Sequence, residues 1–310
     1  MGPMPTRLVH LVVDAADPAG LARFWSGALE WPVTFEEPDE VVIEPPDDDP
    51  AQAGQLPLVF VPVPEPKTSK NRVHLDVAST SDEHKAALVA RLEGLGARQI
   101  DIGQPDDVSW VVMADPEGNE FCVVSHLGSV GKDPASAFAG IGPVAAVVFD
   151  CADPEAIAPF WAAATGWPVL GRDDQGVWLR DNEASGPYLD LHRVSEPKTA
   201  KLRVHLDVAP FSDDDHSAEV TRLRAVGAEP IDIVQASASA TATTPSMVCG
   251  FTSTSTFSMV SRPIRARRSS ASTSSATPSR ADFSPGPTRS PRSTTAGDIE
   301  ARDVLRCHPP

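Results

Sequence analysis

Alternating and helical patterns of apolar residues follow one another along the first part of the chain. Residues 8–14, LVHLVVD, alternate as a β-strand does. Asp17 and Pro18 then provide an N-cap and a first helical position, followed by one apolar stripe at helical spacing. Two further strands are expected at 40–43 and 56–63. This stretch therefore predicts a unit of one strand, one helix and more strands.

The same order returns immediately afterwards. Residues 73–77 alternate again, and Ser81 or Asp82 can cap a second helix. Return strands are expected at 99–102, 109–114 and 120–125. The first 127 residues thus predict an α+β fold built from two similar units.

A 13-residue stretch recurs almost unchanged later in the chain. EPKTSKNRVHLDV at 65–77 returns as EPKTAKLRVHLDV at 196–208, with 11 of the 13 positions identical. A recurrence of this length indicates an internal duplication. In its strand, His74 and Asp76 lie on the face opposite the apolar residues. The basic residues before the strand are typical of a solvated turn, and attraction of an anionic ligand is the alternative.

The duplication defines four segments. Residues 5–127 form a first domain, 128–141 a linker rich in Gly, Ser and Ala, and 142–234 a second domain whose last hairpin is missing. From 235 to 310 the composition changes, and 27 of 76 residues are Ser or Thr. We interpret this tail as disordered or as the result of a reading-frame shift. A makeshift strand within 246–260 is the third possibility.

Charge and composition exclude several classes of function. The formal net charge of −17 argues against a nucleic-acid or anionic-membrane surface, which requires clustered Lys and Arg. No export signal and no apolar run of about 18 residues is found. The four cysteines lack disulfide-type or metal-type spacing. We therefore expect a cytoplasmic protein with reduced thiols whose partner is a small molecule.

Together these motifs resemble the vicinal oxygen chelate superfamily, which includes glyoxalases, bleomycin-resistance proteins and extradiol dioxygenases. The resemblance rests on His10 in the first strand, His74 in the strand that opens the second unit, and DPEGNEFCV at 115–123. It implies paired βαβββ units whose curved sheets form a cleft, in two tandem domains of which the second is truncated.

The resemblance also implies a candidate metal site in the first domain. His10 and His74 match two ligand positions of the metal-using members. The third position departs from their pattern, because Cys122 stands where they have Glu and Glu120 lies two residues earlier. Glu120 is our candidate third ligand and catalytic base, with Cys122 as the alternative ligand. The implied cofactor is Mn, Fe, Co, Ni or Zn.

Several other residues are candidates for contact with a ligand. In the second domain Ala146 replaces His10, so a metal site like that of the family is not expected there. The candidate ligand-binding residues are Asp76, Trp110, Cys122, His192 and His205.

Three functions remain open from the sequence. The first is a metal-dependent lyase, isomerase or dioxygenase that acts on a small oxygen-bearing molecule in the cleft of the first domain. The second is a metal-free protein that binds small molecules, as drug-sequestering members of the superfamily do. The third is an inactive, damaged gene product.

Overall fold

The computed structural model describes residues 6–49, 52, 54–125, 141–181, 186–210, 215–231, 248–249, 257–263 and 303–307. The first domain contains two similar units. The first unit consists of β1 (Arg7–Ala15), α1 (Pro18–Leu29), β2 (Val33–Glu37), β3 (Glu40–Ile43) and β4 (Leu58–Pro62). The second consists of β5 (Val73–Ala78), α2 (Asp82–Gly94), β6 (Arg98–Gln99), β7 (Val111–Ala114) and β8 (Glu120–Val124).

The second domain repeats this order. Its first unit consists of β9 (Val144–Cys151), α3 (Pro154–Thr165), β10 (Val169–Arg172), β11 (Gly176–Leu179) and β12 (Tyr188–Arg193). The next elements are β13 (Val204–Ala209), α4 (His216–Ala225) and β14 (Ala228–Ile231). The predicted α+β fold with tandem units is confirmed. The strand β2 was not expected, because three of its five residues are polar and none of its side chains is fully buried.

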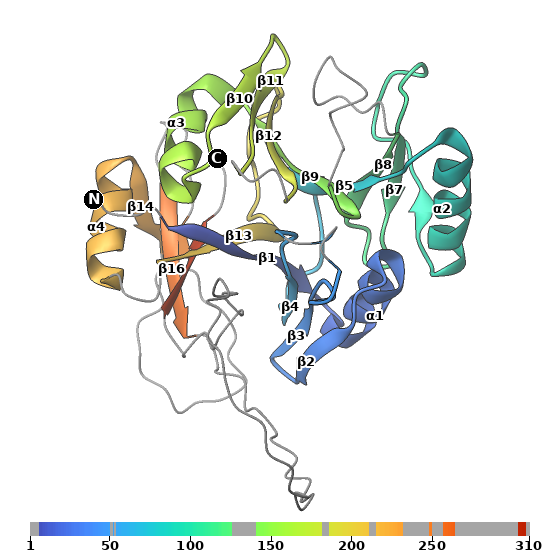
Figure 1. Cartoon of the computed structure of the whole chain (residues 1–310), viewed down its shortest axis with the longest axis horizontal. Coiled ribbons are helices and arrows are strands. Elements are labelled where there is room, and N and C mark those ends of the chain that lie inside the picture. Colours follow the sequence, from blue (N-terminus) through green and yellow to red (C-terminus); the bar gives the residue numbers. More distant parts are fainter. Residues whose placement is uncertain are drawn as a thin grey trace, which may run out of the picture.

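The units pair between the domains. In sheet A, β1 of the first domain pairs antiparallel with β13 of the second. In sheet B, β5 of the first domain pairs antiparallel with β9 of the second. Figure 1 shows sheet B across the top of the molecule and sheet A across its lower half. Each sheet therefore combines half of one domain with half of the other.

The helices begin where the sequence predicts. Asp17 caps α1 by accepting a hydrogen bond from the Gly20 backbone N–H, and Asp153 caps α3 in the same way. Both helices have proline in the first turn. At their ends the backbone turns left-handed, at Gly166 in α3 but at a non-glycine residue, Glu30, in α1.

One apolar core lies against both sheets. Phe24 and Trp25 of α1 contact Phe121 of β8 with ring centroids 6.2 and 5.1 Å apart, so α1 packs on sheet B as well as on β3 and β4 of sheet A. Trp161 of α3 stacks on Phe149 of β9 at 5.2 Å. Because the same core covers one face of each sheet, the other face of each sheet is available for a site.

Three short strands follow β14. They are β15 (Val248–Cys249), β16 (Phe257–Pro263) and β17 (Asp303–Cys307), and they extend sheet A beyond β13. They fall in the segment for which the sequence favours disorder, and β15 and β16 agree with the third possibility of a strand there. The rest of the tail and most of the linker lie outside the described residues.

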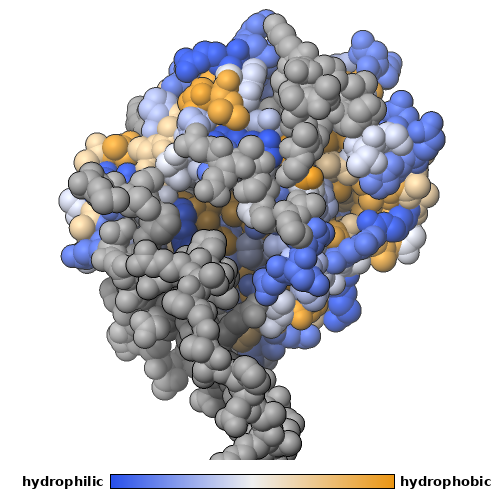
Figure 2. Space-filling view, viewed as in Figure 1, coloured by the Kyte–Doolittle hydropathy of each residue, from blue (hydrophilic) through white to orange (hydrophobic). Residues whose placement is uncertain are grey.

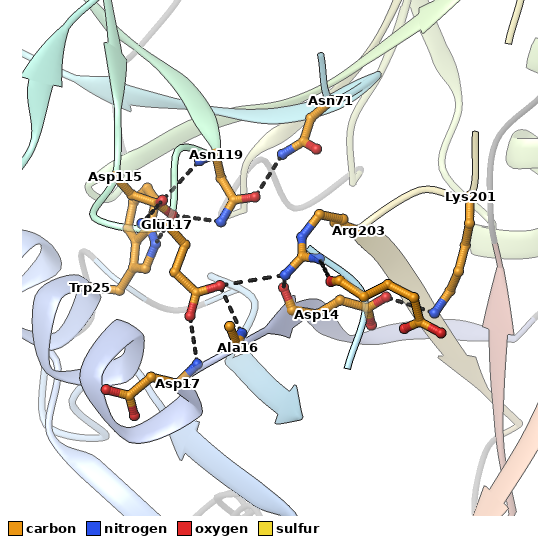
Figure 3. A network of polar contacts seen from close by, with 11 residues as sticks. Asp14, Ala16, Asp17, Trp25, Asn71, Asp115, Glu117, Asn119, Lys201 and Arg203 are labelled. Carbon is orange, nitrogen blue, oxygen red and sulfur yellow. Dashed lines mark hydrogen bonds and ion pairs between the residues drawn. The ribbon is translucent and has the colours of Figure 1, made fainter. Parts of the chain in front are cut away.

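The two copies of the recurrent 13-residue stretch make matching sets of contacts between the domains. We call them the clamps: Lys201 and Arg203 form the first, and Lys70 and Arg72 the second. Arg203 donates from Nη1 to the Glu65 carbonyl and from Nη2 to the Asp14 carbonyl, at 2.7 and 2.8 Å. Lys201 lies 2.8 Å from the Asp14 carboxylate. Figure 3 shows that Arg203 also reaches Glu117, which accepts from the backbone N–H groups of residues 16 and 17.

The second clamp repeats these contacts in sheet B. Arg72 donates from Nε to the Asp150 carbonyl and from Nη1 to the Glu196 carbonyl, at 3.0 and 2.6 Å. Lys70 lies 2.8 Å from the Asp150 carboxylate. The basic residues expected in a solvated turn therefore join the two domains, which explains why this stretch recurs nearly intact.

Candidate functional site

The register of sheet B brings polar side chains together around Val148 of β9. Val148 lies opposite His74 of β5 on one side and opposite Asp190 of β12 on the other. Two residues along β9, Asp150 lies opposite His192. Directly opposed residues point to the same face of a sheet. We call this surface, which faces away from the main core, the Val148 face.

A group of metal-type donors lies on this face. Asp76 lies opposite both Ala146 and Cys122. His74, Asp76 and Cys122 each offer one ligand atom, and these atoms all lie within 4.8 Å of one another. His74 Nε2 is 3.6 Å from Asp76 Oδ1. A ring nitrogen, a carboxylate oxygen and a sulfur therefore converge on one point.

Burial determines the protonation states of this group. Burial lowers the pKa of His74 to about 4, although the nearby Asp150 carboxylate acts in the opposite direction. Burial raises the pKa of Asp76 to about 8, with Asp190 the next cause. Burial also raises the pKa of the Cys122 thiol, which hydrogen-bonds to Asp76. At neutral pH the metal-free group therefore carries little charge.

The other acidic groups of the face differ in their partners. Asp150 is paired with Lys70. The carboxyl group of Asp190 receives neither a hydrogen bond nor an ion pair within the described part of the chain. Burial, followed by the fields of Asp173 and Asp150, raises the pKa of Asp190 to about 7.

The remainder of the face is apolar. Ala146, Val148 and Tyr188 form a small buried cluster, and Trp178 packs against it. The indole of Trp178 lies so close to β10 that a Cβ at Gly171 would be 2.3 Å from the ring, which explains the glycine there. The polar group thus lies beside an apolar and aromatic floor.

Comparisons with known proteins agree with this architecture. A model of the glyoxalase-like domain family matches residues 10–124 and 146–247. The chain belongs to the glyoxalase-like domain family. No curated protein sequence matches it.

Solved structures resemble the chain in fold. Glyoxalase I from Zea mays is 14% identical, and the alignment covers 83% of this chain and 88% of the Zea mays chain with a TM-score of 0.51. A point mutant of that enzyme gives the same values. A glyoxalase/bleomycin resistance protein/dioxygenase family enzyme from Burkholderia phytofirmans, 17% identical, covers 38% of this chain and 98% of its own with a TM-score of 0.32. No helix among the described residues is long and apolar enough to cross a membrane.

This glyoxalase-like chain does not bring the predicted ligands together. His10 lies on β1 of sheet A, whereas His74 lies on β5 of sheet B, because β1 pairs with β13 and not with β5. Glu120 begins β8, but its two oxygens are 2.7 Å from Lys67 Nζ and 3.0 Å from the Asn71 backbone nitrogen. Neither His10 nor Glu120 belongs to the donor group found among the described residues. The three residues expected to share one site therefore lie in two different sheets, and Glu120 is engaged by Lys67 and Asn71.

The other candidates divide between the two sheets. Cys122, Asp76 and His192 lie on the Val148 face. Trp110, at the edge of β7, packs against the apolar end of the same face. His205 lies in sheet A, opposite Val12.

Two residues of the site were not singled out from the sequence. Asp150 and Asp190 occupy outward positions of strands that read as apolar, namely VVFDC and YLDLH. Alternation in each strand was the available signal. Their proximity to His74 depends on pairing between the domains, which alternation does not reveal.

A separate surface hollow lies at the start of α1. It is lined by Asp17, Pro18, Ala19, Glu36, Glu37, Pro38 and Val41. The lining of this hollow contains no histidine or cysteine and lies on the side of sheet A. We therefore take the Val148 face, and not this hollow, as the candidate functional site.

Proposed function

We propose that the Val148 face binds a small oxygen-bearing molecule beside a divalent metal ion held by His74, Asp76 and Cys122. The observation that carries the proposal is the convergence of three different donor atoms within 4.8 Å. Asp76 supports it further, because this residue is 7% exposed and its Oδ1 atom has no hydrogen-bond partner. Nitrogen, oxygen and sulfur ligands together suit zinc, and three protein ligands leave one position for a substrate oxygen.

The metal would supply Lewis acidity toward an oxygen of the ligand. The chain itself supplies the surroundings. Burial keeps His74 neutral, so its ring nitrogen retains the lone pair that ligation needs. The Lys70–Asp150 pair holds one wall of the site in place. The buried apolar floor of Ala146 and Val148 would disfavour water in the space beside the donors. Polarisation of an oxygen is the step that a lyase, an isomerase and an oxygenase of this family type would share.

Metal content tests this proposal directly. The full chain is incubated with zinc, dialysed and measured by elemental analysis. We expect about one zinc per chain, and in His74→Ala and Cys122→Ala a loss of zinc affinity above the roughly 100-fold upper end for changing a residue that only supports a ligand. His10→Ala is the matched control and should bind zinc like the unmodified protein. Zinc-free unmodified protein, or equal loss in the control, would contradict the proposal.

A metal-free binding protein is the second candidate function. Burial leaves Asp76 and Cys122 protonated at neutral pH, so they can act as neutral hydrogen-bonding groups beside an apolar floor. In that case the purified protein contains no stoichiometric metal, and aromatic ligands raise its melting temperature with or without a chelator. The two functions are therefore separated by the effect of chelation on ligand binding.

A further inference from the structure

Asp190 is a partly buried acid of the Val148 face that the proposed metal site does not use. Asp190 on β12 and His74 on β5 lie on opposite sides of Val148, so the strand β9 separates the two residues. With strands about 4.8 Å apart, their backbones are roughly 10 Å from each other. Within the described part of the chain, no side chain neutralises the Asp190 carboxyl.

The carboxyl groups around Val148 outnumber the basic side chains that pair with them among the described residues. Asp76, Asp150 and Asp190 surround it, and Lys70 pairs with Asp150. The Oδ1 atom of Asp76 lies buried without a hydrogen bond, and after burial Asp190 is the largest cause of the raised pKa of Asp76. In the metal-free protein, Asp76 and Asp190 therefore face the same space, and neither is paired with a basic side chain among the described residues.

An ionised carboxyl group that is partly or fully withdrawn from water without a partner is costly, and an added cation offsets that cost. We propose that the ligand of this face carries a cationic nitrogen, a protonated amine or an amidinium, which binds Asp190. The oxygen end of the same ligand would lie at His74, Asp76 and Cys122, and this part of the inference rests on the proposed function. The cation site itself does not require the metal.

The floor between the two ends defines the body of the ligand. Ala146 and Val148 are small and apolar, and Tyr188 and Trp178 add aromatic surface on the side of Asp190. A planar ring between a cationic and an oxygen-bearing end matches this order of polar and apolar groups. The chain's formal charge of −17 would also favour the approach of a cation. Figure 2 shows hydrophilic and hydrophobic residues interspersed over the described part of the visible surface.

The test compares two probes that differ in one group. Tyramine carries a phenol oxygen and a protonated amine, and tyrosol has a neutral hydroxyl in place of the amine. Binding of each to the zinc-treated full chain is measured by titration calorimetry. We expect tyramine to bind at least about tenfold more tightly than tyrosol, the effect of one charged hydrogen bond. In Asp190→Asn the two probes should bind with nearly equal affinity.

The controls separate this inference from the metal site. Glu155→Gln removes an exposed acid of α3 and should keep the preference for tyramine. Zinc content is measured in every variant, and Asp190→Asn should retain zinc. If the unmodified protein prefers tyramine but contains no zinc, the cation site stands and the metal proposal fails. Circular dichroism checks folding, and Asp190→Ser provides a second variant if Asp190→Asn does not fold.

Several results would overturn the cation site. These are equal affinity of the unmodified protein for both probes, no binding of either at millimolar concentration, and a preference for tyramine that persists in the Asp190 variants.

Discussion

At corresponding positions of the duplicated units, β4 of sheet A presents Val59 and Val61, and β12 of sheet B presents Asp190 and His192. The backbone registers match, because Val59 pairs with Val12 as Asp190 pairs with Val148. In sheet A the result is a cluster of Val12, Val42, Val59 and Val61. In sheet B it is a face with three carboxyl groups. The same fold thus carries two different surfaces.

The clamps beside these faces did not diverge in this way. Asp14 and Asp150 make the same two contacts, one with a lysine at 2.8 Å and one with an arginine from the recurrent stretch. Residues that join the domains are constrained from both sides, since each contact involves two distant segments. Residues of the outer faces that take no part in these contacts, such as Val59 and Asp190, lie mainly against their neighbours in the sheet. Duplication can therefore preserve the assembly and still change the chemistry.

The largest expected effect comes from moving an acid into the apolar face. Val59→Asp would bury a carboxyl group among valines, at a residue that is 3% exposed. We expect the free energy of unfolding to fall by about 3–5 kcal/mol, measured by urea denaturation. Asp190→Val is the reciprocal change and should be neutral or stabilising. If Val59→Asp lowers the free energy of unfolding no more than a substitution at an exposed position does, the difference between the two faces is contradicted.

A smaller effect is expected from the clamps. Arg203→Ala removes the hydrogen bonds to the Glu65 and Asp14 carbonyl groups and the contact with Glu117. The carbonyl group of the buried Asp14 then loses this donor. We expect a loss of about 2–4 kcal/mol in unfolding free energy, measured by urea denaturation. Arg72→Ala should cost less, because Arg72 is more exposed and makes no counterpart of the Glu117 contact among the described residues. Equal losses would show that the extra contact contributes nothing.

The smallest effect is a pH dependence specific to sheet B. The folded pKa of Asp190 is raised to about 7, so its neutral form contributes stability that is fully present below about pH 4 and lost as pH rises through 7. The groups that face it are Asp173, Asp150 and Asp76. In chelator-treated protein, Asp190→Asn should therefore gain stability relative to the unmodified chain as pH rises from about 5 to about 8.

Denaturation curves at the two pH values provide the measurement. Glu36→Gln, an exposed change on β2 in sheet A, is the control and should follow the unmodified chain. A parallel pH dependence of the Asp190 variant and the unmodified chain would contradict the assignment of this titration to Asp190.

Local patterns in the sequence determined most of the elements and their facing. Alternation assigned His74 and Asp76 to the outer face of β5, and Asp17-Pro18 marked the start of α1, because these features depend on neighbours in the chain. The duplication and the family type were also readable, since they are properties of the residue order itself.

Only the tertiary structure decided which strands lie side by side. Alternation assigns a side chain to a face but does not say which other strand completes that face. The pairing of β5 with β9, and of β1 with β13, separates His10 from His74 and brings Asp190 and His192 to the latter. Likewise, the Lys67 contact that occupies Glu120 joins residues 53 positions apart. The candidate site depends on such long-range pairing, which the packing of both domains on one core establishes.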